Sequence, residues 1–153
     1  MNSRFTMAAH VLAMLAHAEQ EDRRPVTSER MAASIQTNPV VVRRLLAELA
    51  RAGLVMSKRG TSGGVRLARS PRKITLLDVY SAVEDKVVLF GRHPSGPNPK
   101  CPIGPHVAAY LEGVYGRARE ALEQSLRKVT VARMFEDLPA GVKGHGARRA
   151  RKG

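Results

Sequence analysis

The sequence lacks the residue types on which several classes of protein depend. Among its 153 residues there is one cysteine, no tryptophan, three tyrosines and three phenylalanines. One cysteine cannot form an internal disulfide, and so few aromatic side chains do not suit a sheet that stacks RNA bases. No apolar run approaches the roughly 18 residues of a membrane span. The first residues show no secretory pattern, because Arg4 is followed by an amphipathic segment, so we expect a cytoplasmic protein without membrane contact.

Enzyme motifs are missing as well. The sequence contains no P-loop, no dinucleotide glycine motif, no His-Glu-x-x-His, no nucleophile elbow and no Cys-x-x-Cys. Its five histidines and few carboxylates are scattered along the chain. We therefore expect a binding protein rather than an enzyme.

Acidic residues are few, and they are fewest in one segment of the chain. The chain has 26 Lys and Arg against 13 Asp and Glu, which gives a formal net charge of +13. Residues 39–73 contain nine basic side chains and one acid, Glu48, whereas residues 105–138 contain five of each sign. A basic block beside a neutral one indicates that the first binds nucleic acid. The segment 139–153 is basic and almost without apolar residues, so we expect a disordered tail that serves solubility more than phosphate contact.

The hydrophobic pattern of the first half predicts three helices. Apolar residues recur at helical spacing from Ser3 to Ala18, and Thr27 or Ser28 can cap a short second helix. A third helix should run from Pro39 to Ala52, because Asn38 is a good N-cap and Gly53 a good stop. Its inner face is apolar, and its outer face is basic and otherwise small.

A hairpin and further helices follow the basic helix. Strands over residues 54–58 and 65–68 flank a glycine-rich basic tip, Thr75 caps a fourth helix with Asp78 as its partner, and residues 91–106 read as a loop rich in proline and glycine. A long helix then spans residues 107–129, and Thr130 caps a short last one. The pattern predicts a mainly α-helical protein with a small β-hairpin, namely a winged helix-turn-helix DNA-binding domain followed by a long C-terminal dimerisation helix.

Several residues of this pattern are candidates for contact with double-stranded DNA. A helix fits the major groove, where arginine can pair with guanine, asparagine with adenine, and valine can pack on a thymine methyl. The hairpin tip would contact phosphate or enter the minor groove. The alternative is a merely solvated helix face, but the basic charge, the helix and the hairpin coincide, which favours DNA contact. The candidates are Thr37, Asn38, Val40, Val41, Arg43, Arg44 and Arg51 around the third helix, and Lys58, Arg59, Gly60, Thr61 and Ser62 in the hairpin.

The segment from Ser28 to Glu84 contains three distinctive motifs, namely GLV, RGTSGG followed by LA, and ITLLDVYSAVE. By these motifs the chain resembles, from about Met1 to Glu84, the Rrf2 family of bacterial winged-helix transcription regulators, and the likeness continues weakly through CPIG and the long helix. The resemblance implies a homodimer that represses or activates transcription from a partly palindromic operator. It also implies that the wing tip enters the minor groove and that the long helix is exchanged across the dimer.

The long helix independently suits a dimer interface. It is neutral overall and carries one apolar stripe, which must be buried somewhere. The alternative is that the helix covers the back of its own domain. We divide the chain into a DNA-binding domain (1–85), a sensor-type loop (86–106), the dimerisation helix with the last helix (107–138) and the tail (139–153). The expected interface residues are Leu111, Val114, Tyr115, Ala118, Leu122, Leu126 and Val129.

The loop before that helix departs from the family pattern. Several members hold an iron-sulfur cluster with three cysteines there, whereas this loop has only Cys101. A cluster usually needs four cysteine-like ligands, and a dimer of this chain supplies two. Histidine can replace cysteine in some clusters, but lone histidines near apolar faces are more often structural. We therefore expect no metal and no cofactor.

Cys101 itself has two interpretations. It stands beside Lys100 and shortly before a helix amino terminus, both of which stabilise a thiolate, so it could be a redox switch. Alternatively it is a small apolar residue that packs against the dimer helix, which is the interpretation we favour. The effector stays unknown.

Together these patterns predict a sequence-specific transcription regulator, a repressor rather than an activator, that binds a partly palindromic operator as a homodimer and responds to redox state or a ligand. The alternative is a winged-helix module that binds nucleic acid by charge alone or binds a protein partner. Salt dependence and sequence preference distinguish the two.

Overall fold

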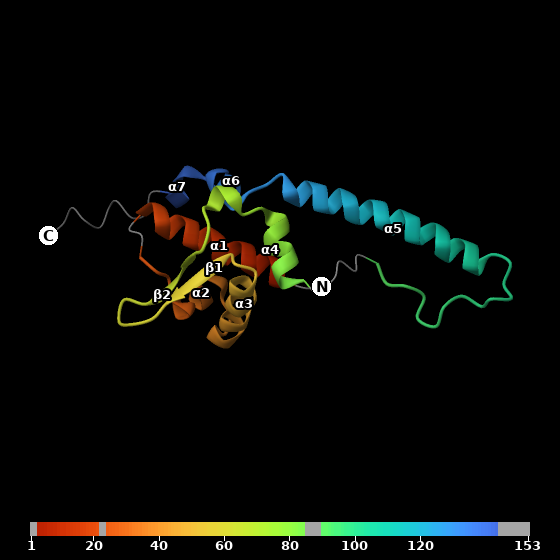
Figure 1. Ribbon diagram of the computed structural model, residues 1–153, viewed down its shortest axis with the longest axis horizontal. Helices are drawn as coiled ribbons and strands as arrows, with labels where there is room; N and C mark the ends of the chain where they lie inside the picture. The colour runs from red at the N-terminus through yellow and green to blue at the C-terminus, as the bar shows by residue number, and fades with distance from the viewer. Residues whose placement is uncertain (1–2, 22–23, 85–89, 144–153) are drawn as a thin grey trace.

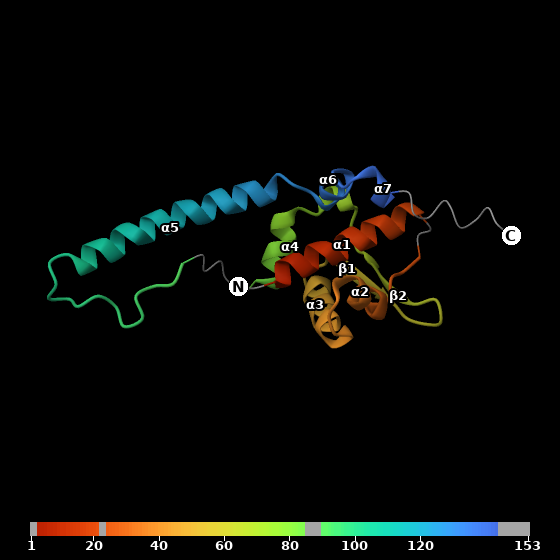
Figure 2. The ribbon, with the colours of Figure 1, turned by 180° about the vertical axis from the view of Figure 1, so that it is seen from behind.

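The chain has two parts of different shape. The computed structural model describes residues 3–21, 24–84 and 90–143. The described residues of 3–84 and 130–138 pack together, and we call them the body. Residues 90–129, which we call the arm, project away from the body as a loop and one long helix (Figure 1), and Figure 2 shows the same division from behind. The prediction of a mainly helical fold with one small antiparallel hairpin is confirmed.

Polar N-caps start four of the helices. The side-chain oxygens of Thr27, Asn38, Thr75 and Thr130 each accept a backbone N–H from the turn that follows. At Thr75 the cap is reciprocal, because the Asp78 carboxylate accepts the N–H of Thr75. These predicted caps are confirmed. The elements are α1 (Arg4–Glu21), α2 (Ser28–Ile35), α3 (Pro39–Arg51), η1 (Pro71–Lys73), α4 (Leu76–Val83), α5 (Gly104–Arg127), α6 (Val131–Glu136) and α7 (Ala140–Lys143), where η1 is a 3-10 turn.

Several boundaries differ from the prediction, and α3 and α5 end one and two residues early, at Arg51 and Arg127. α1 ends at Glu21 rather than Ala18. α5 begins at Gly104 rather than Val107, because Pro105 fits the first turn of a helix, where its missing N–H is not needed. α7 occupies the start of the segment predicted as a disordered tail. The rest of that tail, and residues 86–89 of the predicted loop, lie outside the described residues.

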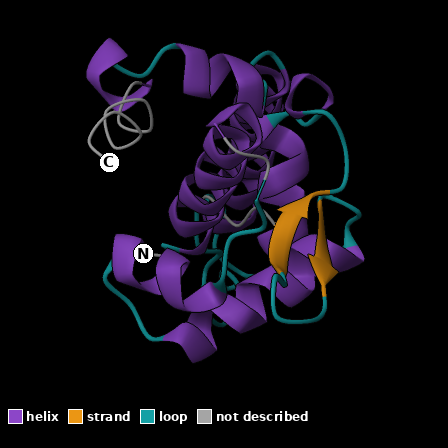
Figure 3. Cartoon of the chain, turned by 90° about the vertical axis from the view of Figure 1, so that its left-hand side faces the viewer, coloured by secondary structure: helices purple, strands orange, loops and turns teal. Residues whose placement is uncertain are grey.

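One hairpin, which we call the wing, follows α3. β1 (Val55–Lys58) pairs antiparallel with β2 (Gly64–Leu67). β1 begins one residue later than predicted, and β2 is shifted by one residue toward the tip of the hairpin. Between α1 and α2, Val26 exchanges two backbone hydrogen bonds of 2.9 and 2.8 Å with Val65. The bridge therefore ties the tip half of β2 to the segment before α2. Figure 3 shows the two strands beside the helices, and Figure 1 shows the wing tip extending past α2.

The last part of the chain returns to the body. Residues 74–76 and 129–131 form a short antiparallel pairing with two backbone hydrogen bonds of 2.8 Å. α6 then packs on α1, and its Val131 and Phe135 are 0% and 3% exposed. The sequence pattern groups α6 with the dimerisation helix and does not predict that it completes the core of the body.

The core lies between α1, α2, α3, α4, α6 and the base of the wing. The apolar faces predicted for α1 and α3 are buried in it. Among the described residues, no helix combines the length and apolar character needed to cross a membrane. The helices contribute Ala8, Val11, Leu12, Leu15 and Ala16 from α1, Met31 and Ala32 from α2, Val42, Leu45, Leu46 and Leu49 from α3, and Val79 and Val83 from α4.

Candidate nucleic-acid interface

α3 presents its outer face to solvent. Because its apolar face is buried in the core, the side chains on the opposite side point outward. Arg44 and Arg51 are exposed on that side, and neither forms an ion pair with a carboxylate of the described residues. Of the residues predicted to contact DNA around this helix, Thr37 is half-buried, and Asn38, Val40, Val41, Arg43, Arg44 and Arg51 are exposed.

Asn38 has a structural task at the start of α3. Its Oδ1 accepts the N–H of Val40 at 2.8 Å. A bidentate contact between asparagine and adenine needs the amide oxygen as an acceptor and the amide nitrogen as a donor. The cap therefore already uses one of the two lone pairs of the oxygen on which the predicted adenine contact depends.

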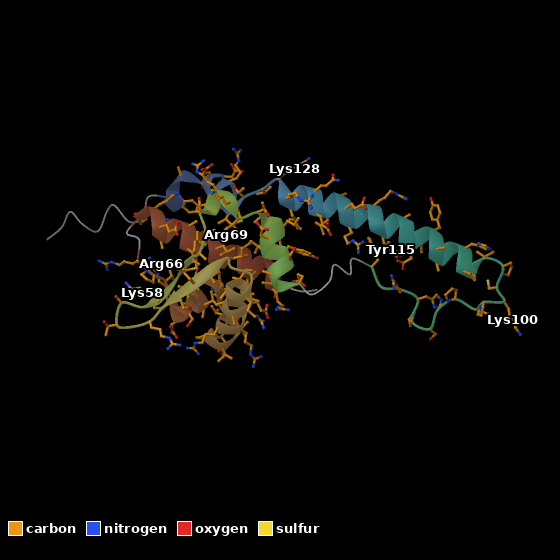
Figure 4. The ribbon with its side chains drawn as sticks, in the orientation of Figure 1. Lys58, Arg66, Arg69, Lys100, Tyr115 and Lys128 are labelled. Carbon is orange, nitrogen blue, oxygen red and sulfur yellow. The ribbon has the colours of Figure 1, made fainter. Side chains whose placement is uncertain are left out.

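α3 and the wing border an open groove of about 580 Å³, which we call the α3–wing groove. Ala47 and Ala50 line the groove on its α3 side, and their short side chains leave it open there. The groove brings Arg43 of α3 to the same concavity as Lys58 and Arg59 of the wing. Figure 4 labels Lys58 on the wing, with Arg66 and Arg69 further along the chain, and Arg66 lines a separate hollow that includes Leu15 and Ala18 of α1. The lining consists of Thr27, Ser28 and Glu29, then Arg43, Leu46, Ala47 and Ala50, then Ser57, Lys58, Arg59, Gly60, Gly63, Gly64 and Val65.

Glycines allow the wing to turn tightly. The N–H of Gly63 donates to the Gly60 carbonyl at 2.9 Å and closes a turn over Thr61 and Ser62, both of which are exposed. A Cβ atom on Gly63 would lie 2.5 Å from a backbone oxygen of the wing. Gly64 has φ 151°, and a Cβ there would lie 2.9 Å from a backbone oxygen before α2. Side chains at either position would displace the tip.

Ion pairs adjust the charge around α3. Arg43 Nη2 donates to Glu29 Oε1 at 2.6 Å and so joins α3 to α2. Glu48, the single acid of the basic block, pairs with Arg4 of α1. The pKa of the Glu29 carboxyl is held below its ordinary value. The largest cause is a hydrogen bond from the backbone amide of Glu29, followed by those from Arg43 and Ser28. Residue spacing does not predict the Arg43–Glu29 pair, because the partners lie on different helices. The acid in the first turn of α2 was its only signal.

The loop of the arm folds back along α5. The Phe90 ring stacks on Tyr115 with ring centroids 4.7 Å apart, and Arg92 Nε pairs with Glu112 Oε1 at 2.7 Å. Between the loop and α5 lies a largely apolar cavity of about 890 Å³. Figure 4 shows Lys100 at the far end of this loop and Tyr115 on α5.

Cys101 lies just before α5 and lines this cavity. Its Sγ accepts the N–H of Gly104 at 3.3 Å. The backbone N–H groups of Gly104 and Ile103 hold the pKa of the thiol below its ordinary value. The side chain is half-buried, so the thiol is partly accessible, and its role stays a prediction.

α5 has an apolar stripe but no buried residue in the single chain. Tyr110 is 72% exposed, and Ile103 and Val107 are exposed beside it. Of the predicted interface residues, Leu111 is exposed, and Val114, Tyr115, Ala118, Leu122, Leu126 and Val129 are half-buried.

Comparisons with known proteins agree with this architecture. The profile of the Rrf2 family, described as iron-dependent transcriptional regulators, matches residues 1–137. YwnA of Bacillus subtilis, whose name places it among HTH-type transcriptional regulators, is 37% identical over 82% of this chain and 90% of its own length. The structure of T. potens IscR superposes with a TM-score of 0.68 and 25% identity over 90% of this chain and 86% of its own. CymR of B. subtilis, titled the global cysteine regulator, shares the fold with a TM-score of 0.69 and 19% identity, over 91% and 98% of the two chains.

The family description raises the question of an iron site. Within the described ranges, no group of three or more His, Cys, Asp or Glu side chains could hold a metal ion. Cys101 is the one cysteine of the chain, and its Sγ is engaged with a backbone N–H. This donor set does not fit an iron-sulfur cluster.

Proposed function

Because this chain belongs to the Rrf2 family of DNA-binding transcriptional regulators, we propose that it represses transcription as a homodimer bound to a partly palindromic operator. The family consists of regulators rather than enzymes. The observation that carries the proposal is the α3–wing groove, in which basic residues of a helix and a hairpin line one concavity.

In the proposed complex α3 lies in the major groove and the wing enters the adjacent minor groove. The sugar-phosphate backbone that separates the two DNA grooves then passes through the α3–wing groove. Arg44 and the exposed Val40 and Val41 reach base edges. Arg51, Lys58 and Arg59 contact phosphates and position the protein without reading sequence.

The arm is the proposed dimer interface. Its apolar stripe has no cover in the single chain, and a second copy of α5 offers a matching stripe by symmetry. A dimer places two copies of α3 about one helical turn apart on the same face of the duplex. Two-fold symmetry of the operator follows from that arrangement.

The arm is also the proposed sensor. A signal received there reaches both DNA-binding bodies of a dimer at once. Cys101 is the candidate thiol for a redox response, and the cavity beside it is the candidate site for a ligand. Since the donor set does not fit iron, we propose that regulation proceeds without an iron-sulfur cluster.

Selection from a random duplex library by the purified protein at physiological salt tests the proposal. We expect a two-fold symmetric consensus, bound on the order of a thousandfold more tightly than random DNA. Survivors without a shared motif would instead favour a module that binds by charge or binds a protein. Transcription from a promoter that contains the consensus should fall when the protein is added, and a rise would refute repression.

Two arginine variants test the assignment of contacts. Arg44→Ala should weaken consensus binding by about 1–3 kcal/mol and relax the choice of one base pair. Arg51→Ala should weaken consensus and random duplexes alike. If both variants lose affinity for the consensus and for random duplex to the same extent, the assignment of direct base readout to Arg44 is wrong.

A further inference from the structure

Glu29 is an acid on a surface that is otherwise basic. It lines the α3–wing groove together with Arg43, Lys58 and Arg59. Its side chain is 61% exposed, and that of its partner Arg43 is 57% exposed. An exposed carboxylate in this position repels DNA, so its presence needs an explanation other than core packing.

The place of Glu29 on α2 is where a DNA phosphate is expected. In a helix-turn-helix the helix before the recognition helix crosses the DNA backbone. Backbone N–H groups at a helix amino terminus attract anions. Glu29 stands in the first turn of α2, and its Oε1 accepts hydrogen bonds from Arg43 Nη2 at 2.6 Å and from Ser28 Oγ at 3.1 Å.

We propose that the Glu29 carboxylate is an internal substitute for a DNA phosphate. In the free protein it holds Arg43 against α2. When DNA binds, a backbone phosphate takes the place of the carboxylate on Arg43. The inference rests on the proposed placement of DNA in the α3–wing groove and makes Arg43 a phosphate contact rather than a reader of bases.

The exchange has a thermodynamic signature. An exposed ion pair is weak, so breaking it lowers affinity by about two- to fivefold. The loss is the same on every sequence, because phosphates carry no sequence information. Arg43 reaches the phosphate from a carboxylate rather than from a solution anion. A plot of log affinity against log salt concentration should therefore have a slope about one unit shallower for the wild-type protein than the number of its phosphate contacts predicts.

Affinity measurements over a series of KCl concentrations test this role. Glu29→Gln should bind the selected consensus and a scrambled duplex about two- to fivefold more tightly, and its log–log salt slope should steepen by about one unit. Asp137→Asn is the matched control. It makes the same change of net charge in an exposed pair, Arg133–Asp137, whose side chains are 66% and 58% exposed. That pair involves α6, which lies on the side of the body away from α3 (Figures 1 and 2), and we expect the control to match the wild type.

Other results would overturn the inference. If Glu29→Gln behaves like Asp137→Asn, the Arg43–Glu29 pair is an ordinary surface contact. If Glu29→Gln changes the preferred base at one position of the selected site, Glu29 reads a base instead. Glu29→Ala should act in the same direction as Glu29→Gln, and thermal midpoints should confirm that each variant is folded. If the selection yields no consensus, the proposed operator binding fails, but salt slopes on random duplex still decide the role of Glu29.

Discussion

The body and the arm differ in how they bury their apolar side chains. The body buries the apolar faces of α1, α2, α3, α4 and α6 against one another. The 24-residue helix α5 of the arm buries none of its residues in the single chain. Apolar side chains such as Ile103, Val107 and Tyr110 stay exposed there. The body can thus be stable by itself, whereas in the proposed dimer the arm gains most of its stability from the second copy.

The largest expected effect is on the body. Phe135→Ala removes a core ring of α6 and should lower the free energy of unfolding by about 3–5 kcal/mol. Urea denaturation followed by circular dichroism measures this loss. Ile103→Ala, at an exposed apolar position of the arm, is the control and should change it little. A small effect of Phe135→Ala would mean that α6 does not belong to the core.

The next prediction concerns dimerisation through the arm, which should change without loss of stability in the body. Val114→Asp combined with Leu122→Asp puts charges into the proposed dimer interface and should cost several kcal/mol of association, because an unpaired buried charge is expensive. Analytical ultracentrifugation should then show monomers at micromolar concentration. The urea midpoint of the body should remain near that of the wild type. A dimer that survives both changes would place the interface elsewhere.

A smaller effect is expected where the two regions meet. Thr75 caps α4 and stands opposite Thr130 at the base of the arm. Thr75→Ala removes the hydroxyl that accepts the N–H of Asp78, which is one half of the capping box, so stability should fall by about 1 kcal/mol. Thr61→Ala at the exposed wing tip provides the comparison and should leave the urea midpoint unchanged. Equal changes of the urea midpoint in the two variants would show that the Thr75 cap does not stabilise the region where the arm meets the body.

The smallest effect concerns the chemistry of the arm. Hydrogen bonds from Gly104 and Ile103 lower the pKa of the Cys101 thiol, so its thiolate persists to lower pH than that of an unperturbed cysteine. The rate of alkylation by iodoacetamide should therefore rise at a lower pH than the rate for a cysteine peptide measured alongside. The rate for the urea-unfolded chain should return to that of the peptide. An identical pH profile before and after unfolding would contradict the effect of these N–H groups.

Local features of the fold could be predicted from the sequence. Asn38, Thr75 and Thr130 mark helix starts because capping depends on residues within one turn. The hairpin follows from glycines between two short apolar strands. The outer basic face of α3 follows from helical spacing alone. These features need no knowledge of what lies far away in the sequence.

Features that depend on distant residues could not be predicted in this way. The contact of Phe135 with α1 and the Val26–Val65 bridge join segments that are far apart in the chain. The Arg43–Glu29 pair depends on the angle between two helices, which residue spacing does not give. The apolar pair Val131 and Phe135, one turn apart, was the available sign that α6 packs on a core. The DNA contacts, the dimer interface and the four-segment division of the chain stay predictions.

The return of α6 to the body determines the order in which the molecule can be completed during synthesis. Translation produces α1 first and α6 near the end, yet the core that α1 begins is filled by Val131 and Phe135. The whole of α5 leaves the ribosome before those two side chains do. If α5 is the dimer interface proposed above, it can meet another nascent chain while the core of the body is still open, so dimerisation can precede the final closure of the body.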